Sequence, residues 1–207
     1  MRAPVRAGLA AVALALAVSG CGARPGPEEE QAAPTARPQA VAGGTELRER
    51  PCPDRARPFE PTTVVVAGVQ ADVQVVYPAR VTADVPGTPP TDAVGKQQVA
   101  FDRDQGVRPG DRRGNVLLNA HTFPDGSALG NRLLDGLREG GRLVLSGPDG
   151  RLCYRVTDRV EVDATEPFFR YYETDGRPQV ALVVCSGTRL GPGVWTKRTV
   201  WFASPSA

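Results

Sequence analysis

Short valine-rich stretches separated by turn residues dominate the chain from about residue 60 onward. Several of them alternate apolar and polar positions, as around Tyr154, Val156, Val160 and Val162. A period of two is typical of strands that bury one face. The pattern predicts eight strands: Thr62–Val66, Ala71–Val76, Val99–Phe101, Gly114–Ala120, Arg142–Ser146, Leu152–Val162, Gln179–Cys185 and Thr196–Ala203.

Helical spacing occurs in one segment. Four leucines recur at intervals of one, three and four residues across Ala128–Arg138, before Gly140-Gly141 ends the pattern, so a helix is expected there. A short helical turn is expected over Phe168–Tyr172. Eight short strands with one or two helices in their connections predict a mainly β fold, a closed or nearly closed barrel, because closure removes exposed strand edges.

The N-terminus has the features of a targeting segment. Arg2 and Arg6 precede an apolar run, Leu9–Val18, which is too short to span a bilayer comfortably. The run ends in Val18-Ser19-Gly20-Cys21, which resembles a bacterial lipobox. The resemblance implies that residues 1–20 are a lipoprotein signal peptide and that Cys21 carries the lipid. An ordinary secretory signal and an uncleaved anchor are the alternatives; each places the domain outside the membrane, at the extracellular face of the cell.

Composition divides the rest of the chain. Residues 21–51 are rich in Pro, Ala and Glu and lack aliphatic periodicity, so they are expected to form a flexible tether, with the folded domain at 52–207. A net charge of +2 with scattered arginines gives no indication of a nucleic-acid partner.

The chain has four cysteines, and each needs a role that fits the oxidising compartment predicted for the domain. With Cys21 assigned to lipid and Cys185 to chemistry, Cys52 and Cys153 remain, and one disulfide between them is the simplest interpretation. Two unpaired thiols, or a redox pair of Cys153 with Cys185, are the alternatives. No Cys-x-x-Cys pattern supports either of them.

Three of the predicted β segments each contain, or are followed directly by, one reactive residue: His121, Cys185 and Arg198. A cysteine nucleophile needs a base or a cation that favours its thiolate, and acyl transfer needs a positive or hydrogen-bonding group for the developing oxyanion. His, Cys and Arg together meet these needs, whereas each alone is as well explained by a structural role. Arg189, in the segment after Cys185, is the alternative cation.

The segments around these residues, Asn119–Phe123, Ala181–Cys185 and Gly193–Ala203, resemble the three signature regions of sortases. Cys185 follows His121 by 64 residues, and Arg198 follows Cys185 by 13, in the family's order. The resemblance covers about residues 58–203. It implies an eight-stranded sortase-type barrel and a cysteine transpeptidase that works without a cofactor or metal, as a monomer.

The same resemblance implies the partners and roles. Cys185 would attack the threonine carbonyl of an LPxTG-like sorting-signal peptide, and an amine acceptor of the cell wall or a pilin, or water, would resolve the thioacyl enzyme. His121 would act as general acid and then base, and Arg198 would hold the substrate and the oxyanion. The Arg- and Ala-rich composition points to class F, or to class E.

The sequence departs from the family pattern at three positions. Ala181 and Val184 replace two threonines before the cysteine, and Ala120 replaces the glycine before the histidine. One alternative is therefore a catalytically degenerate sortase-like lipoprotein that binds cell-wall peptides or a protein partner. Another is an L,D-transpeptidase, which is disfavoured because that family carries a histidine close before its cysteine.

Overall fold

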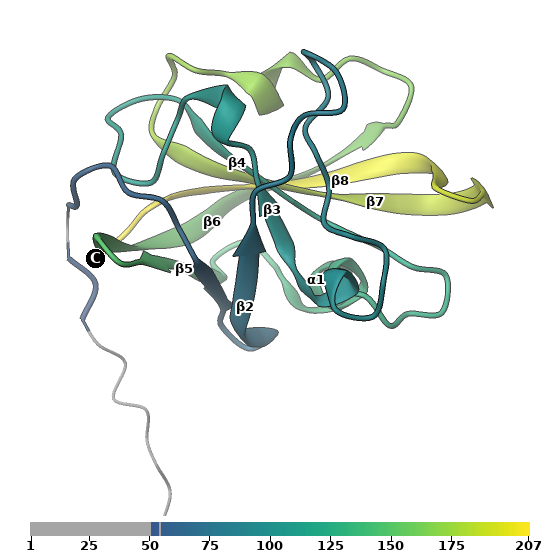
Figure 1. Ribbon diagram of the computed structural model, residues 1–207, viewed down its shortest axis with the longest axis horizontal. Helices are drawn as coiled ribbons and strands as arrows, with labels where there is room; N and C mark the ends of the chain where they lie inside the picture. The colour runs from purple at the N-terminus through teal and green to yellow at the C-terminus, as the bar shows by residue number, and fades with distance from the viewer. Residues whose placement is uncertain (1–50, 54) are drawn as a thin grey trace, which may run out of the picture. The chain divides into compact units, whose positions relative to one another are not determined.

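The computed structural model describes residues 51–53 and 55–207 (Figure 1). The predicted signal peptide, the predicted lipidation site Cys21 and all but the last residue of the predicted tether lie outside the described residues. The elements are β1 Thr63–Val66, β2 Gln70–Val76, η1 Gly95–Gln97, β3 Val99–Phe101, η2 Arg103–Gln105, β4 Asn115–Ala120, α1 Leu129–Gly136, β5 Arg142–Gly147, β6 Gly150–Asp163, η3 Phe169–Tyr172, β7 Gln179–Gly191 and β8 Val194–Pro205.

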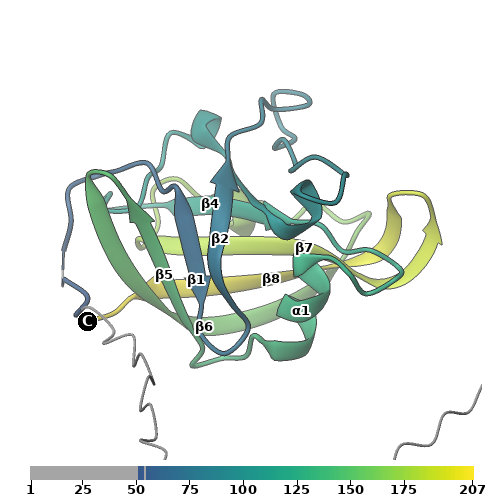
Figure 2. The ribbon, with the colours of Figure 1, turned by 60° about the horizontal axis from the view of Figure 1, so that its bottom comes forward.

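The eight strands close into a barrel in the order β1-β2-β3-β4-β7-β8-β6-β5. Two neighbouring pairs, β2 with β3 and β4 with β7, are parallel, and the others are antiparallel. β1 and β5 pair across the closure, which Figure 2 shows with the two strands side by side. The predicted mainly β, eight-stranded barrel is confirmed.

Side chains alternate across the barrel wall, as the period of two predicts. On β4, Val116, Leu118 and Ala120 point into the barrel core. Leu117 points the other way, into a second cluster that η3 covers with the buried side chain of Tyr171. The outer face of β4 is thus covered at one end and left open at the other, where the strand finishes.

The helix α1 is shorter than the predicted Ala128–Arg138 segment. It ends at Gly136 because Leu137 takes an extended conformation (φ −82°, ψ 121°) and buries its side chain in the core. The Leu137 carbonyl then accepts a hydrogen bond from the indole nitrogen of Trp201, 3.1 Å away. Packing against β8 therefore overrides the leucine periodicity at this end.

Strand β7 does not end at Cys185, so the predicted end of the Gln179–Cys185 strand is wrong. The strand continues to Gly191 as one arm of a hairpin with β8, and its register shifts between Ser186 and Arg189. Gly187 has φ +76°, which allows the bulge without ending the pairing. The hairpin extends beyond the barrel body in both ribbon views (Figures 1 and 2).

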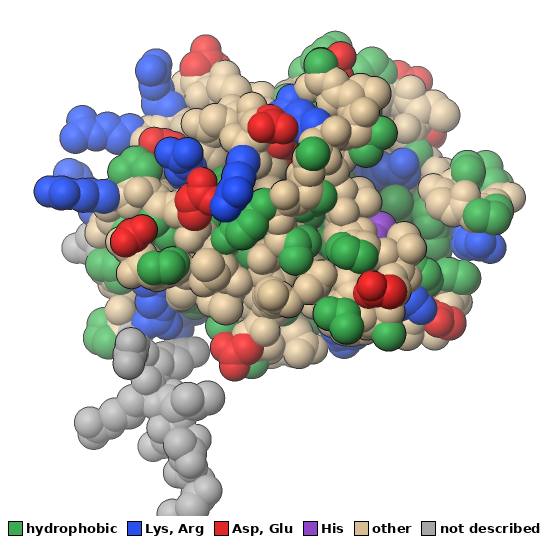
Figure 3. All heavy atoms as spheres, viewed as in Figure 1, with side chains coloured by type: hydrophobic (Ala, Val, Ile, Leu, Met, Phe, Trp, Pro, Cys, Tyr) green, Lys and Arg blue, Asp and Glu red, His purple; other side chains and the backbone are tan. Residues whose placement is uncertain are grey.

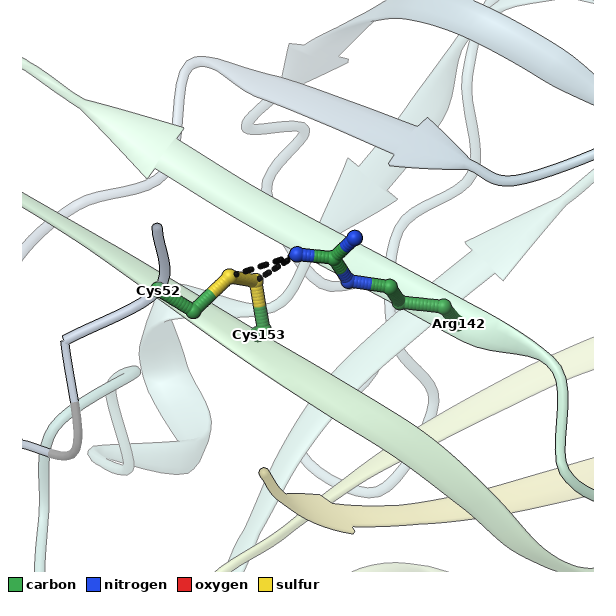
Figure 4. Close-up of a disulfide and its surroundings, with 3 residues drawn as sticks. All are labelled: Cys52, Arg142 and Cys153. Carbon is green, nitrogen blue, oxygen red and sulfur yellow. Dashed lines mark hydrogen bonds between the residues drawn. A yellow bond between two sulfur atoms is a disulfide. The ribbon is translucent and has the colours of Figure 1, made fainter. Parts of the chain in front are cut away.

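The predicted disulfide joins Cys52 to Cys153 on β6, with Cα atoms 5.7 Å apart (Figure 4). The Arg142 guanidinium on β5 points at the two sulfurs, with Nη2 3.0 and 3.4 Å from them. The backbone of Cys153 also accepts a hydrogen bond from the amide of Ser206. Both ends of the described chain are therefore fixed at the same point of the barrel. Within residues 51–53 and 55–207, no helix is long and apolar enough to cross a membrane.

Candidate active site

His121, Cys185 and Arg198 occupy neighbouring positions on three adjacent strands. β4 and β7 pair in parallel up to Ala120 opposite Val184, so His121 and Cys185 are the next residues of the two chains. Across the antiparallel β7–β8 pair, Cys185 lies directly opposite Arg198. Because alternate residues share a face, all three side chains lie on the outer face, the one that η3 leaves open. The structure thus brings the three predicted residues together.

A cleft of about 880 Å³ opens over this row of residues, and all three line it. Its walls come from the β2–β3 connection, the Phe123-Pro124 turn, η3 and the β7–β8 hairpin. A small area of the only histidine is visible at the surface among hydrophobic side chains in Figure 3. The cleft is therefore large enough for an extended peptide and is mostly apolar in its walls, as ligand sites generally are.

Cys185 is the only free cysteine among the described residues and is half-buried. Burial raises the pKa of the Cys185 thiol, because desolvation disfavours the thiolate, and the positive charge of Arg198 acts in the opposite direction. Since the ordinary thiol pKa is already about 8.5, the resting side chain is mainly neutral near pH 7. A thiol in this state reacts as a nucleophile only where a base, a cation or bound substrate favours its thiolate.

The Arg198 guanidinium is held by a hydrogen bond to the backbone of the neighbouring residue. Its Nη1 donates to the carbonyl of Lys197, the preceding residue, at 3.0 Å. No carboxylate in the described part of the chain forms an ion pair with Arg198. A guanidinium that is half-buried and has no anionic partner is suited to bind a substrate carbonyl or an oxyanion. Arg189 also lines the cleft but is exposed and lies in the irregular part of β7.

His121 is held through both its backbone and its ring. Its carbonyl accepts from the amide of Gly130 at 2.8 Å, at the start of α1. Ring nitrogen Nε2 lies 2.6 Å from the carbonyl oxygen of Pro89, in the β2–β3 connection. A carbonyl can only accept, so Nε2 is the donor in this pair.

Thr122 connects the histidine segment to the cysteine strand. Its hydroxyl donates to the carbonyl of Cys185 at 2.7 Å, and the side chain is buried. The bond joins the chain just beyond β4 to β7 at Cys185. Sequence reasoning missed both this contact and the Pro89 contact. Position next to His121 is the only signal that pointed to Thr122, and nothing pointed to Pro89.

The two substitutions before the cysteine occupy different environments. Val184 is 2 % exposed and packs in the barrel core, and it also borders the cleft beside Cys185. Ala181 is fully buried in the second cluster, beneath η3. Neither change removes a polar group from the row formed by His121, Cys185 and Arg198.

The aromatic residues of the η3 region divide between packing and lining. Tyr171 is buried, and its hydroxyl donates to the carbonyl of Leu118. Phe168 and Tyr172 line the cleft, which Tyr171 also borders, whereas Phe169 is 81 % exposed. Within the described residues, no group of histidine, cysteine or acidic side chains is arranged to hold a metal ion.

No family model matches the chain, and no curated protein sequence does. Among solved structures, the chain is similar to sortase A of Listeria monocytogenes, with 19% identity, 70% of this chain and 86% of that one covered, and a TM-score of 0.51. It is also similar to sortase C1 of Streptococcus suis (18% identity, 71% and 73% covered, TM-score 0.53). A third is sortase C-1 of Actinomyces oris (18% identity, 72% and 76% covered, TM-score 0.52). At these identities the likeness concerns the fold, and the chain has the sortase fold.

Proposed function

We propose that this protein is a sortase-type cysteine transpeptidase. It would cleave an LPxTG-like sorting signal through a thioacyl intermediate on Cys185 and transfer the product to an amine, or to water. The observation that carries the proposal is the row formed by His121, Cys185 and Arg198 across β4, β7 and β8, on the floor of the cleft. Each of the three residue types supplies a different requirement of acyl transfer.

In the first half-reaction, the thiol proton of Cys185 passes to His121 and the sulfur attacks the threonine carbonyl of the peptide. Arg198, without an ion-pair partner in the described chain, stabilises the oxyanion. The C–N bond then breaks, and His121 returns the proton to the leaving amine. The products are a thioester on Cys185 and the released C-terminal peptide.

In the second half-reaction, the amine nucleophile attacks the thioester carbonyl and loses a proton to His121. The C–S bond breaks as the new amide forms, and the proton goes back to the Cys185 sulfur. Water in place of the amine gives a carboxylic acid instead. Histidine is suited to both directions because its ordinary pKa lies near neutrality.

The proposal includes a place for the reaction. A lipid on Cys21 would hold the domain at the extracellular face of the membrane, close to secreted proteins that carry sorting signals. Assignment to class F, or to class E, belongs to the same proposal and rests on composition. Processing that is sensitive to globomycin, and loss of membrane association on Cys21→Ser, would support the lipid anchor.

The test is cleavage of a quenched fluorescent library of LPxTG-type peptides by the full chain in detergent micelles, with and without triglycine. Cys185→Ala should abolish cleavage, and Arg198→Ala should lower kcat/KM by about 10²–10³-fold, as loss of one oxyanion donor does. Arg189→Ala is the matched control, because this second cleft arginine does not face the nucleophile.

Cleavage with a peptide–triglycine product would support transpeptidation, and a free acid alone would support hydrolysis. Cleavage that survives Cys185→Ala would contradict the proposal. A folded protein that cleaves no member of the library, with Cys185 unreactive toward thiol reagents, would contradict it as well.

A further inference from the structure

The strap, residues Gly87–Pro90 of the β2–β3 connection, lies against His121. Its Pro89 carbonyl accepts from His121 Nε2 at 2.6 Å. Gly87 and Pro89 are buried, although no strand or helix includes them. A carboxylate orients the histidine of Ser-His-Asp triads through Nδ1–H, whereas the strap offers a backbone oxygen to Nε2.

The strap is held from three sides. The side-chain amide of Asn119 donates to the Gly87 carbonyl at 2.9 Å, in a buried contact. A Cβ atom at Gly87 would meet the Ala79 carbonyl oxygen, and one at Gly95 would meet the Pro90 carbonyl oxygen, so the backbone is packed closely at both ends. Two consecutive prolines also fix φ and favour extended backbone before each ring. The strap is therefore a fixed part of the site.

The Pro89 contact decides which ring nitrogen of His121 exchanges a proton. Because Nε2 donates to a carbonyl, it stays protonated in both the neutral and the cationic ring. Nδ1 is the nitrogen that gains and loses the proton. The charged and titratable groups that share the cleft with this ring are Cys185, Arg189, Arg198, Asp163, Glu166, Tyr171 and Tyr172.

Asn119 is an unusual residue to bury at this position. Its side chain is 8 % exposed, and its Oδ1 has no hydrogen-bond partner among the described residues. A buried acceptor without a partner lowers stability, so Oδ1 is a cost of having the amide at this position. What the amide does provide is the Nδ2 donor to the strap.

Asn115 offers an internal comparison. It lies four residues earlier on the same face of β4, and its Nδ2 donates to the carbonyls of Arg170 and Tyr171 at 2.7 and 3.1 Å. Its Oδ1 likewise has no partner in the described chain. The two amides have the same chemistry, but Asn115 holds η3 and Asn119 holds the strap.

We propose that Asn119 is a positioning residue for His121, which acts through the strap. By fixing the Gly87 carbonyl, it holds the Pro89 carbonyl as an acceptor for Nε2–H and keeps Nδ1 free for proton exchange with the substrate. The catalytic part of this inference rests on the proposed function, in which His121 is the general acid and base. The positioning part is a property of the resting protein.

The single histidine allows a direct test by NMR, because every imidazole signal of the chain comes from His121. Long-range ¹H–¹⁵N spectra of the full chain, labelled with ¹⁵N-histidine in detergent micelles, report which ring nitrogen carries the proton. The wild-type neutral ring should be a single tautomer with the proton on Nε2. Asn119→Leu should populate both tautomers, whereas Asn115→Leu should keep the wild-type tautomer.

Activity provides the second measurement. In the peptide assay, Asn119→Leu should lower kcat by about 10-fold or more, a part of the roughly 10²–10⁴-fold that general acid–base catalysis contributes, with a thermal midpoint no lower than that of Asn115→Leu. A wild-type ring with the proton on Nδ1, or a tautomer unchanged by Asn119→Leu, would overturn the positioning. A rise in kcat would also overturn it, since the strap would then be an inhibitory lid. Failure of the proposed function appears separately, as absence of cleavage by a wild-type chain that has the expected tautomer.

Discussion

The rate at which iodoacetamide labels the Cys185 thiol should depend on two opposing influences on the thiol pKa, burial and the charge of Arg198. Burial raises its pKa and Arg198 lowers it. The labelling rate should rise with pH with a midpoint above the ordinary thiol value of about 8.5, because only the thiolate reacts. Arg198→Ala should move the midpoint further up, since the cation that favours the thiolate is lost. Mass spectrometry of the modified peptide at a series of pH values measures both.

Cys185→Ser supplies the blank for this experiment, because Cys21 is a second possible site of modification. Arg189→Ala supplies the matched loss of a positive charge in the same cleft. A wild-type midpoint below the ordinary value would contradict the burial argument. Equal shifts in the two arginine variants would mean that general cleft charge, and not the position opposite Cys185, sets the thiol's ionisation.

Thr122 should matter for activity beyond its effect on stability. Thr122→Val removes the hydroxyl that bonds the Cys185 carbonyl but keeps the shape of the side chain. We expect the free energy of unfolding to fall by about 1–2 kcal/mol, the cost of one buried acceptor left without its donor, and the cleavage rate to fall because the histidine and cysteine segments are no longer joined. Urea unfolding and the peptide assay measure the two effects.

Thr157→Val is the matched control, because the Thr157 hydroxyl also donates to a backbone carbonyl, that of Phe202, but outside the cleft. It should leave cleavage at the wild-type rate. If both variants lose activity in proportion to stability, Thr122 has no special role in the site.

The three reactive residues could be predicted from the sequence because each follows or lies in a valine-rich strand, and because their order is informative. Their partners could not. The Pro89 carbonyl comes from a loop 32 residues before His121, and a backbone acceptor has no residue type to recognise. Asn119 was part of a signature segment but had no assigned role, since only the folded strap shows what its amide contacts.

At the level of elements, β7 beyond Cys185 is the main difference from prediction. Ser186-Gly187 reads as a turn because glycine is common there, yet pairing with β8 continues the strand around a bulge to Gly191. Pairing with β8 therefore outweighs the preference of Ser186-Gly187 for a turn. The paired hairpin also places Arg189 and Trp195 in the cleft wall. The other strands agree with prediction to within two or three residues at each end.

This bulge predicts a difference between two glycines of the hairpin. Gly187 and Gly193 both have positive φ, so an alanine at either costs about 1–2 kcal/mol of backbone strain. A Cβ at Gly187 would also meet Thr196 Oγ1 and the Lys197 side chain, whereas one at Gly193 meets nothing within 4 Å. Gly187→Ala should therefore destabilise the hairpin more and lower peptide cleavage more.

Hydrogen exchange at the Thr188 amide, which donates to Thr196 Oγ1 at 2.9 Å, measures the effect locally. Faster exchange in Gly187→Ala than in Gly193→Ala is the expected result. Equal exchange in the two variants would mean that the neighbours of Gly187 move aside without loss, and that the register of the bulge does not depend on the missing side chain.

At the scale of the whole molecule, we expect the Cys52–Cys153 disulfide to contribute to stability but not to activity at 25 °C. It closes a loop with a sequence separation of 101 residues, for which chain entropy gives about 4–5 kcal/mol of stabilisation. Reduction, or Cys52→Ser, should lower the thermal midpoint by roughly 10 °C or more. Differential scanning calorimetry with and without reductant measures the change.

Activity at 25 °C should survive that loss, because the disulfide is remote from the cleft. Val162, a cleft residue, lies nine residues beyond Cys153 on β6, a separation of about 30 Å along an extended strand. The disulfide thus fixes Cys52 at the end of β6 that is remote from the cleft. Loss of cleavage in Cys52→Ser at a temperature where the barrel is still folded would contradict this separation, and would mean that the disulfide end of β6 and the cleft end do not behave as independent parts.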